Sequence, residues 1–358
     1  MGLLIAAGAL LFGYATAWVA SDDVRYLTRA GFEETRILMG RVPISSLAAD
    51  STAPIHLREA ATLVRDARDY ARHLGLEAGE TYTTYSDVGR DTLLLVLTAS
   101  PKHCLCPVTW WFPVVGRAPY KGFFDFKKAA EEAEKYRIRD YDVHLRPSPA
   151  FSTLGWFNDP LLSTAVSPDP VELAALVFHE VGHNTVWHAG ATDFNESFAQ
   201  WLGYRSAEQF FLARGDSAQA LRALQRWHDE RILERYYDRL VERLDSLYSA
   251  NPTPAELNAG RDAVMQWARD TLAAPFGQSL RTIDPERLGA RPINNAALLG
   301  VRLYRTRLEQ FDEWYSINRR DLAATVFALR EALEGMQDLD PWLVLSALIG
   351  EQPVAPPQ

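Results

Sequence analysis

The segment Phe178-His179-Glu180-Val181-Gly182-His183 constrains this chain more than any other. Two histidines four positions apart fall on one face of a helix, where both rings can bind the same metal ion. The intervening glutamate then lies beside the open position of the metal as a general base. The motif works only on a helix, so it predicts both that element and a zinc-dependent hydrolytic site.

The residues before the motif favour the helix that it needs. Asp169 is placed as an N-cap, Pro170 takes the first helical position, and Glu172 is placed for a capping box. Apolar residues then surround the segment, which predicts burial: Val171, Leu173, Ala174, Ala175, Leu176, Val177, Phe178 and Val181. Because burying two histidines and a glutamate is costly without partners, a shared metal explains them better than ordinary core packing does.

A third ligand decides the class of metal site, and the candidate is Glu196. Two roles compete for its carboxylate: metal ligand, or capping-box residue of a following helix with Asp193 as its N-cap. Two neutral histidines leave zinc short of a ligand, and no cysteine or further histidine follows at the interval typical of metzincins. This favours Glu196 as the ligand, with His188 and Asp193 as the alternatives.

With these residues the chain resembles known families. The motif HEVGH with the downstream Asn195-Glu196-Ser197-Phe198-Ala199 is similar to the glutamate zincins, or gluzincins, whose third zinc ligand is the glutamate of an Asn-Glu pair on the next helix. From about Ile44 to Tyr304 the chain more closely resembles a bacterial family of predicted aminopeptidases. The similar segments are Gly89-Arg90, Trp111-Phe112-Pro113-Val114, Tyr120-Lys121-Gly122-Phe123-Phe124, Ser152-Thr153-Leu154-Gly155-Trp156-Phe157, Asp159-Pro160-Leu161-Leu162-Ser163-Thr164 and Asn294-Asn295-Ala296.

The resemblance implies a zincin-like α+β metallopeptidase, with a small mixed sheet followed by a mainly helical C-terminal half. In it His179, His183 and Glu196 hold Zn²⁺, and Glu180 is the general base for the hydrolysis of a peptide substrate. Gluzincins also stabilise the oxyanion with a tyrosine or histidine from the C-terminal helices. Tyr304 is the candidate for that role, and a helix-packing tyrosine is the alternative.

A zincin sheet offers an edge strand along which an extended peptide can bind through main-chain hydrogen bonds. The expected substrate-binding edge comprises Ser152, Thr153, Leu154, Gly155 and Trp156, whose composition fits ordinary strand packing equally well.

Two departures from the gluzincin pattern bear on metal affinity and specificity. Gln200 stands four residues after Glu196, where thermolysin-like enzymes have an aspartate that steadies a zinc-bound histidine. The stretch 151–157 lacks the glutamate with which alanyl aminopeptidases hold the substrate amine, and Asp159 is the nearest acid. We therefore expect an aminopeptidase, with an exported zinc endopeptidase or a non-catalytic binding protein as alternatives.

The N-terminus carries a second signal, since residues 2–20 contain no charged side chain. Nineteen uncharged residues can just span a bilayer, while Ala15-Thr16-Ala17 is an acceptable signal-peptidase site. A retained membrane anchor and a cleaved signal peptide both fit. Either predicts export to the bacterial periplasm or to the periplasmic face of the inner membrane, and a buried soluble helix is the alternative.

Composition and charge narrow the remaining classes. The net charge is −9 and no cluster of lysine and arginine alternates with aromatic residues, which argues against nucleic-acid binding. Cys104 and Cys106 are the only cysteines, and packed side chains, a local disulfide or a second metal site are the options in that order. Nothing in the sequence indicates the oligomeric state.

The expected organisation has five parts. Residues 1–20 form the export segment, 21–165 an N-terminal α/β part, 166–250 the zinc-site helices, 251–350 a helical part and 351–358 a disordered tail. Strands are expected at 92–98, 108–112 and 141–145. Helices are expected at 22–39, 54–74, 125–136, 216–249, 254–274, 294–315 and 321–333, the fourth kinked or braced as a hairpin.

Overall fold

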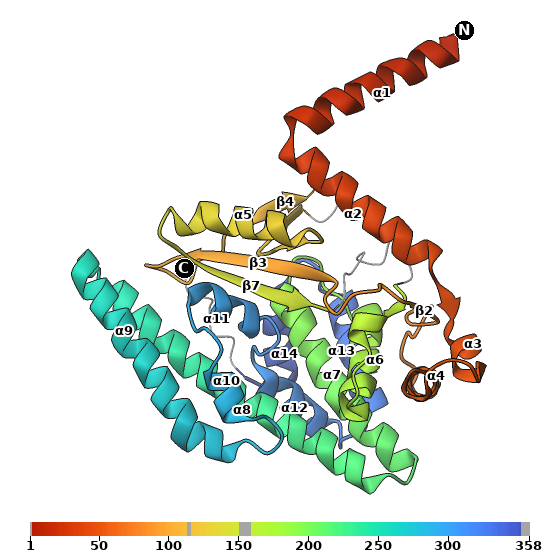
Figure 1. The fold of residues 1–358 in the computed structure, drawn as a ribbon. Coiled ribbons are helices and arrows are strands. Elements are labelled where there is room, and N and C mark those ends of the chain that lie inside the picture. Colours follow the sequence, from red (N-terminus) through yellow and green to blue (C-terminus); the bar gives the residue numbers. More distant parts are fainter. Residues whose placement is uncertain (1, 113–115, 150–158, 352–358) are drawn as a thin grey trace.

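The computed structural model describes residues 2–112, 116–149 and 159–351 (Figure 1). The N-terminal half contains α1 (Gly2–Ala20), α2 (Asp22–Met39), β1 (Val42–Pro43), α3 (Ile44–Ala49), α4 (Ile55–His73), β2 (Thr84–Ser86), β3 (Leu94–Pro101), β4 (Trp110–Phe112), β5 (Gly116–Ala118), β6 (Lys121–Phe123), α5 (Phe126–Arg137), β7 (Tyr141–Ser148) and β8 (Leu161–Leu162).

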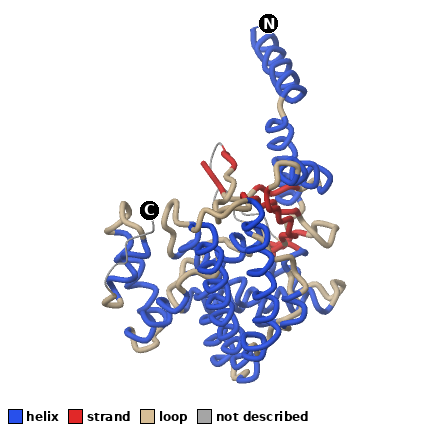
Figure 2. Tube along the Cα trace, turned by 90° about the vertical axis from the view of Figure 1, so that its left-hand side faces the viewer, coloured by secondary structure: helices blue, strands red, loops and turns tan. Residues whose placement is uncertain are grey.

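Helices dominate the second half of the chain. They are α6 (Pro170–Thr185), α7 (Thr192–Ala213), α8 (Ser217–Ser249), α9 (Pro254–Thr271), α10 (Pro285–Gly289), α11 (Asn295–Arg302), α12 (Leu308–Ile317), α13 (Leu322–Glu334) and α14 (Pro341–Leu348). Figure 2 shows the strands gathered to one side of this helical body. The predicted α+β class, with small sheets before a mainly helical half, is confirmed.

The largest sheet separates two sets of helices. Its strands run antiparallel in the order β6-β3-β7. One face packs on α5 through Leu97, Val143 and Leu145. On the other face the hydroxyl of Thr98 donates to the carbonyl of Ala296 at 3.1 Å, and Asp142 accepts from the backbone N–H of Asn295 at 2.9 Å. This second face, covered by α11, looks toward α6 and α7 (Figure 1).

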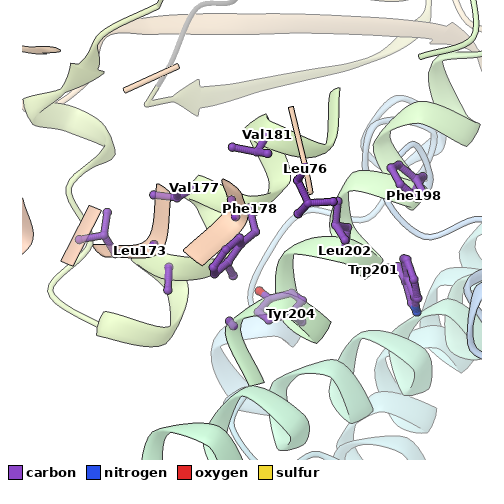
Figure 3. Close-up of a cluster of buried hydrophobic side chains, with 14 of the residues drawn as sticks. Leu76, Leu173, Val177, Phe178, Val181, Phe198, Trp201, Leu202 and Tyr204 are labelled. Atoms are coloured by element: carbon purple, nitrogen blue, oxygen red, sulfur yellow. The ribbon is translucent and has the colours of Figure 1, made fainter. Parts of the chain in front are cut away.

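Helices α6 and α7 pack tightly against each other, with Phe178, Phe198 and Leu202 in the core between and around them (Figure 3). Gly203 permits the close approach, since a Cβ there would lie 2.8 Å from the carbonyl oxygen of Ala175 and 3.5 Å from the Cβ of His179. Contact this close fixes the register of the two helices. It therefore sets where residues of α7 meet the histidines of α6.

The long helix α8 is braced by its neighbours. It runs for 33 residues without interruption, or about 50 Å. Leu233, Tyr236 and Leu240 form a second hydrophobic cluster with Met265 and Ala268 of α9. The two helices lie side by side as an antiparallel pair (Figure 1), so the expectation of a braced hairpin is confirmed.

One predicted helix is wrong. The segment 294–315 is two helices, α11 and α12, joined by a loop at residues 303–307. Arg307 has a left-handed backbone with φ 48°. Hydrogen bonds from Ser197 on α7 take the place of intrahelical bonds in this loop, to Leu303 and Thr306. Helix α14 was not predicted, and the two cysteines form a disulfide rather than lying free.

Helix α1 projects away from the rest of the molecule (Figure 1). Three of its apolar side chains are largely exposed: Leu11 at 69%, Phe12 at 76% and Val19 at 72%. No described helix combines the length and the apolar character that crossing a membrane requires.

Candidate metal centre

The structure brings His179, His183 and Glu196 together at the contact between α6 and α7. The two histidine Nε2 atoms lie 3.2 Å apart. Oε2 of Glu196 lies 3.4 Å from Nε2 of His179 and 3.7 Å from Nε2 of His183. Among the described residues these three are the only group of histidine, cysteine and acidic side chains close enough to share a metal ion.

The spacing of these donor atoms fits one tetrahedral metal ion. Ligand atoms about 2.0–2.2 Å from such an ion lie about 3.3–3.6 Å from one another. Without a cation, by contrast, two ring nitrogens and a carboxylate oxygen face one another, and only protons on the ring nitrogens can lie between them. The donor set, two imidazoles and one carboxylate, is the set found in many catalytic zinc sites.

The three side chains are accessible although their helices are buried. His179, His183 and Glu196 are 12%, 19% and 18% exposed, while their chain neighbours Phe178 and Ser197 are fully buried. The backs of both helices therefore lie in the core, and the donor atoms face a side that a small ligand can reach.

The electrostatics keep Glu196 and His183 in the forms that bind metal, and they favour the protonated form of His179. Burial alone would raise the pKa of Glu196, but its hydrogen bond to His179 and the charge of His183 lower it. Burial lowers the pKa of His183 to about 4, helped by the charge of His179. Burial would also lower the pKa of His179, but Glu196 and Glu180 raise it. An ionised carboxylate and a neutral His183 offer lone pairs, as metal ligands must.

Glu180 is the carboxylate beside this group. Its pKa is raised to about 7, mainly by burial and also by the charges of Glu196 and Asp159, against the opposing effect of His179. A carboxyl group that titrates near neutral pH can both accept and release a proton, as a general base and acid must.

The capping-box alternative for Glu196 is wrong. Helix α7 begins at Thr192 after Ala191, which makes no side-chain cap. Asp193 instead accepts from the indole N–H of Trp342 at 3.1 Å. Because the side chain of Asp193 binds Trp342 on α14, it does not cap α7. Asp193 therefore lies outside the group formed by His179, His183 and Glu196, and Glu196 turns toward the two histidines.

Asn195 holds the connection between the two helices. Its side-chain oxygen accepts from the backbone N–H of His188 at 2.9 Å, and its amide donates to the carbonyl of His188 at 2.8 Å. His188, an alternative ligand in the sequence, is thereby part of the turn, and it does not belong to the metal-binding group.

Tyr304 lies beside the metal-binding group on the loop between α11 and α12. Its ring is stacked on that of His179, with centroids 6.1 Å apart and 30° between the planes. Ser197 anchors this loop on both sides of the tyrosine: its hydroxyl donates to the carbonyl of Leu303 at 3.3 Å and accepts from the N–H of Thr306 at 3.0 Å. The residue next to Glu196 thus positions Tyr304.

Comparison with protein families bears on this site. A family model described as "Putative aminopeptidase" matches residues 25–339. The chain belongs to this family. No curated protein and no solved structure matched the chain. Membership of the aminopeptidase family suggests peptidase activity, and the match includes all the residues of the site described above.

In this member of the putative aminopeptidase family, Gln200 and the predicted capping-box residue Glu172 both have partners elsewhere. Nδ1 of His183 is buried and makes no hydrogen bond among the described residues. Gln200 acts on Glu230 of α8, whose pKa it helps to lower. Glu172, expected in a capping box, pairs with Arg226 at 2.8 Å and accepts from the hydroxyl of Tyr204 at 3.0 Å. Asp169 caps α6 as predicted.

The predicted substrate edge, Ser152, Thr153, Leu154, Gly155 and Trp156, lies outside the described residues. Two other residues near the site were not predicted. Arg146 on β7 lowers the pKa of Glu196, and Tyr120, before β6, has its own pKa raised by burial and by the charge of Glu196. Tyr120 begins the family-like segment Tyr120-Lys121-Gly122-Phe123-Phe124, but that resemblance gave it no role. Arg146 lies in no such segment, and strand pairing brings it to the site.

Proposed function

We propose that this protein is a zinc-dependent peptidase, and an aminopeptidase in particular. The spacing of the three donor atoms supports the metal most directly, since 3.2, 3.4 and 3.7 Å fit ligands of one ion. Family membership supports peptide hydrolysis. His179, His183 and Glu196 are the proposed zinc ligands.

A zinc ion held there would supply Lewis acidity toward a water nucleophile and the peptide carbonyl. The residues of the chain then have separate tasks. Glu180 accepts a proton from the attacking water and delivers it to the departing amine. Burial and the charge of Glu196 raise the pKa of Tyr304, so its hydroxyl stays protonated and can donate to the developing oxyanion.

Glu180→Gln is the decisive variant. We expect zinc content to stay at one ion per chain while kcat falls by about 10²–10⁴-fold, the usual contribution of a general acid-base. Glu208→Gln is the matched control, because Glu208 lies on α7 and pairs with Arg205 at 3.1 Å. Metal analysis and hydrolysis of a peptide library are the measurements. Undiminished hydrolysis by Glu180→Gln would reject the assigned role.

The same assay separates the alternative functions. An aminopeptidase cleaves peptides with a free amine and spares the N-acetylated forms, whereas an endopeptidase cleaves both. Zinc binding without cleavage of any peptide would instead indicate a non-catalytic binding protein. Absence of stoichiometric zinc from protein purified without chelators would contradict the metal proposal itself.

We further propose that the protein is exported to the bacterial periplasm or to the periplasmic face of the inner membrane, with residues 2–20 as a cleaved signal or a retained anchor. The uncharged sequence and the exposure of Leu11, Phe12 and Val19 support this. Fractionation of cells expressing the full chain tests it, since recovery in the cytoplasmic fraction contradicts export.

A further inference from the structure

Arg146 lies on the face of the main sheet that looks toward the metal-binding group. On strand β7 it is two residues from His144 and four from Asp142, so the three share one face. Asp142 contacts α11 on that face through its bond with the backbone of Asn295. Val143 and Leu145 point the other way and pack on α5. The register therefore directs Arg146 away from α5.

Tyr120 shares this face from the opposite side of the sheet. Val96 of β3 is paired with both Arg146 and Gly122, and Tyr120 precedes Gly122 by two positions. Tyr120 packs against the main core, which includes Val96 and the helices of the metal-binding group. Phe123, of opposite parity, packs on α5 instead. Tyr120 and Arg146 thus flank the central strand on the same side.

The guanidinium of Arg146 acts electrostatically on the candidate active site. Its charge lowers the pKa of Glu196 and partly offsets the rise in the pKa of Tyr304 and of Tyr120. The charge of Arg146, on an outer strand, therefore acts on Glu196, Tyr304 and Tyr120, which come from other parts of the chain.

Arg146 makes no ion pair within the described part of the chain, in contrast to Arg261. Arg261 approaches the same sheet face, and Asp142 neutralises it at 2.6 Å. Arg146 is partly buried, and a partly buried guanidinium is expected to find an anion. A bound ligand can therefore supply the negative charge that balances Arg146.

We propose that Arg146, with Tyr120 beside it, binds a carboxylate of the peptide substrate. This inference rests on the proposed peptidase function and names the class of peptide that the site prefers. A guanidinium offers two parallel N–H donors that match a carboxylate. The carboxylate comes from one of two sources, the C-terminus of a short peptide or an acidic side chain near the cleaved bond.

Two pairs of peptides separate these sources. Tri-alanine as free acid and as C-terminal amide differ only in the terminal carboxylate. Ala-Glu-Ala amide and Ala-Gln-Ala amide differ only in the side-chain carboxylate. We expect wild-type protein to prefer the carboxylate-bearing member of one pair by about 10–100-fold in kcat/KM, the range of a charge-assisted hydrogen bond. The preference should lie mainly in KM.

In Arg146→Gln this preference should fall to about one, with zinc content and Tm unchanged. Arg146→Lys should keep part of the preference, because it retains the charge and loses the fork; it also serves if the glutamine variant fails to fold. Arg139→Gln is the control, since Arg139 is exposed just before β7 and its guanidinium lies over the rings of Tyr136 and Tyr141. It should keep the wild-type ratios.

The proposal is overturned if wild type shows no preference within either pair, or if Arg146→Gln lowers kcat/KM equally for both members. Failure of the proposed function looks different, because then wild type cleaves none of the four peptides. In that case calorimetric binding of the same uncleaved peptides to wild type and Arg146→Gln gives the two ratios directly. Equal affinities there would overturn the proposal as well.

Discussion

Two clusters of buried charged groups lie next to each other on α6, α7 and α8, and they are completed differently. In the first, Glu230 is fully buried, 2.6 Å from Nε of Arg305 and 3.3 Å from Nη2 of Arg226. In the second, Glu196 is 18% exposed, and its ion pairs with described residues are to the imidazoles of His179 and His183. Two guanidiniums of the protein neutralise Glu230, whereas Glu196 has no guanidinium partner among the described residues, as the proposed metal site requires.

The difference separates a structural cluster from a binding site. Burial alone would raise the pKa of Glu230, but Arg305 and Arg226 lower it, so its charge is fully compensated. Arg305 also follows Tyr304 directly in the chain, and Gln200 is one helical turn from Glu196. The cluster around Glu230, which we call closed, therefore holds in place the loop of Tyr304 and the helix of Glu196. The cluster around Glu196 is called open.

The largest expected effect comes from breaking the closed cluster. Glu230→Gln leaves the guanidinium of Arg305 without a counter-charge in the core, while Arg226 keeps its ion pair with Glu172. This should lower the free energy of unfolding by about 3–5 kcal/mol. Urea unfolding of the metal-free variant and of the metal-free wild type measures this difference. Zinc content of the folded variant should remain at one ion per chain.

The matched substitution in the open cluster should have the opposite pattern. Glu196→Gln removes a carboxylate that has no guanidinium partner among the described residues, so the metal-free protein should unfold within about 1 kcal/mol of wild type. Zinc should be lost on dialysis, since one of three ligands is gone. If Glu230→Gln loses zinc while folded as completely as Glu196→Gln does, the two clusters are not separate.

A smaller effect is expected at the boundary between the clusters. Ser197→Ala removes both hydrogen bonds that hold the loop around Tyr304, at a cost of about 1–3 kcal/mol for the buried backbone groups left unpaired. Because Tyr304 then loses its fixed position, kcat should fall about 10-fold, with zinc content and KM little changed. Steady-state kinetics and metal analysis measure these values.

Ser206→Ala is the control for that variant. Ser206 is equally buried on the same helix, and its hydroxyl has no hydrogen-bond partner in the described chain, so its removal should leave kcat unchanged. A fall in kcat equal in both variants would show that loss of a buried hydroxyl from α7, rather than release of the Tyr304 loop, causes the effect.

The sequence predicted the parts of this site that depend on local structure. Asp169 and Pro170 mark the start of α6, and the spacing of His179 and His183 places both rings on one face before any tertiary contact is known. Glu196 was harder, because its choice between cap and ligand depends on Trp342, which holds Asp193 from 149 residues away. Local sequence contains no signal of that contact.

The substrate side of the site could not be predicted for the same reason. Tyr304 was identified only through resemblance, and the helix expected around it is interrupted because Ser197 binds the loop from α7. Arg146 reaches the site through the register of β7 with β3. Strand register and loop anchoring are tertiary properties, so a single sequence with local patterns leaves them open.

The smallest expected effect compares two glutamates one turn apart on α8. Glu234 is buried like Glu230, at 5% exposure against 0%. Its pKa is nevertheless raised to about 7 from the usual 4.5, mainly by burial and also by Asp238, against the opposing effects of Leu308 N–H and Arg231. The folded state thus binds a proton more tightly than the unfolded state does. Its stabilising contribution is present below pH 4.5 and is lost as pH rises through 7.

Glu234→Gln removes this dependence because the amide stays neutral. Relative to wild type, the variant should gain about 1–3 kcal/mol in free energy of unfolding between pH 5 and pH 8, since each pKa unit corresponds to about 1.4 kcal/mol. Urea unfolding of both metal-free proteins at the two pH values measures the gain. Glu230→Gln should show no such gain, because Arg305 and Arg226 lower the pKa of Glu230. A difference between wild type and Glu234→Gln that is equal at both pH values would mean that Glu234 is ionised in the folded protein, and the two glutamates would then belong to one compensated cluster.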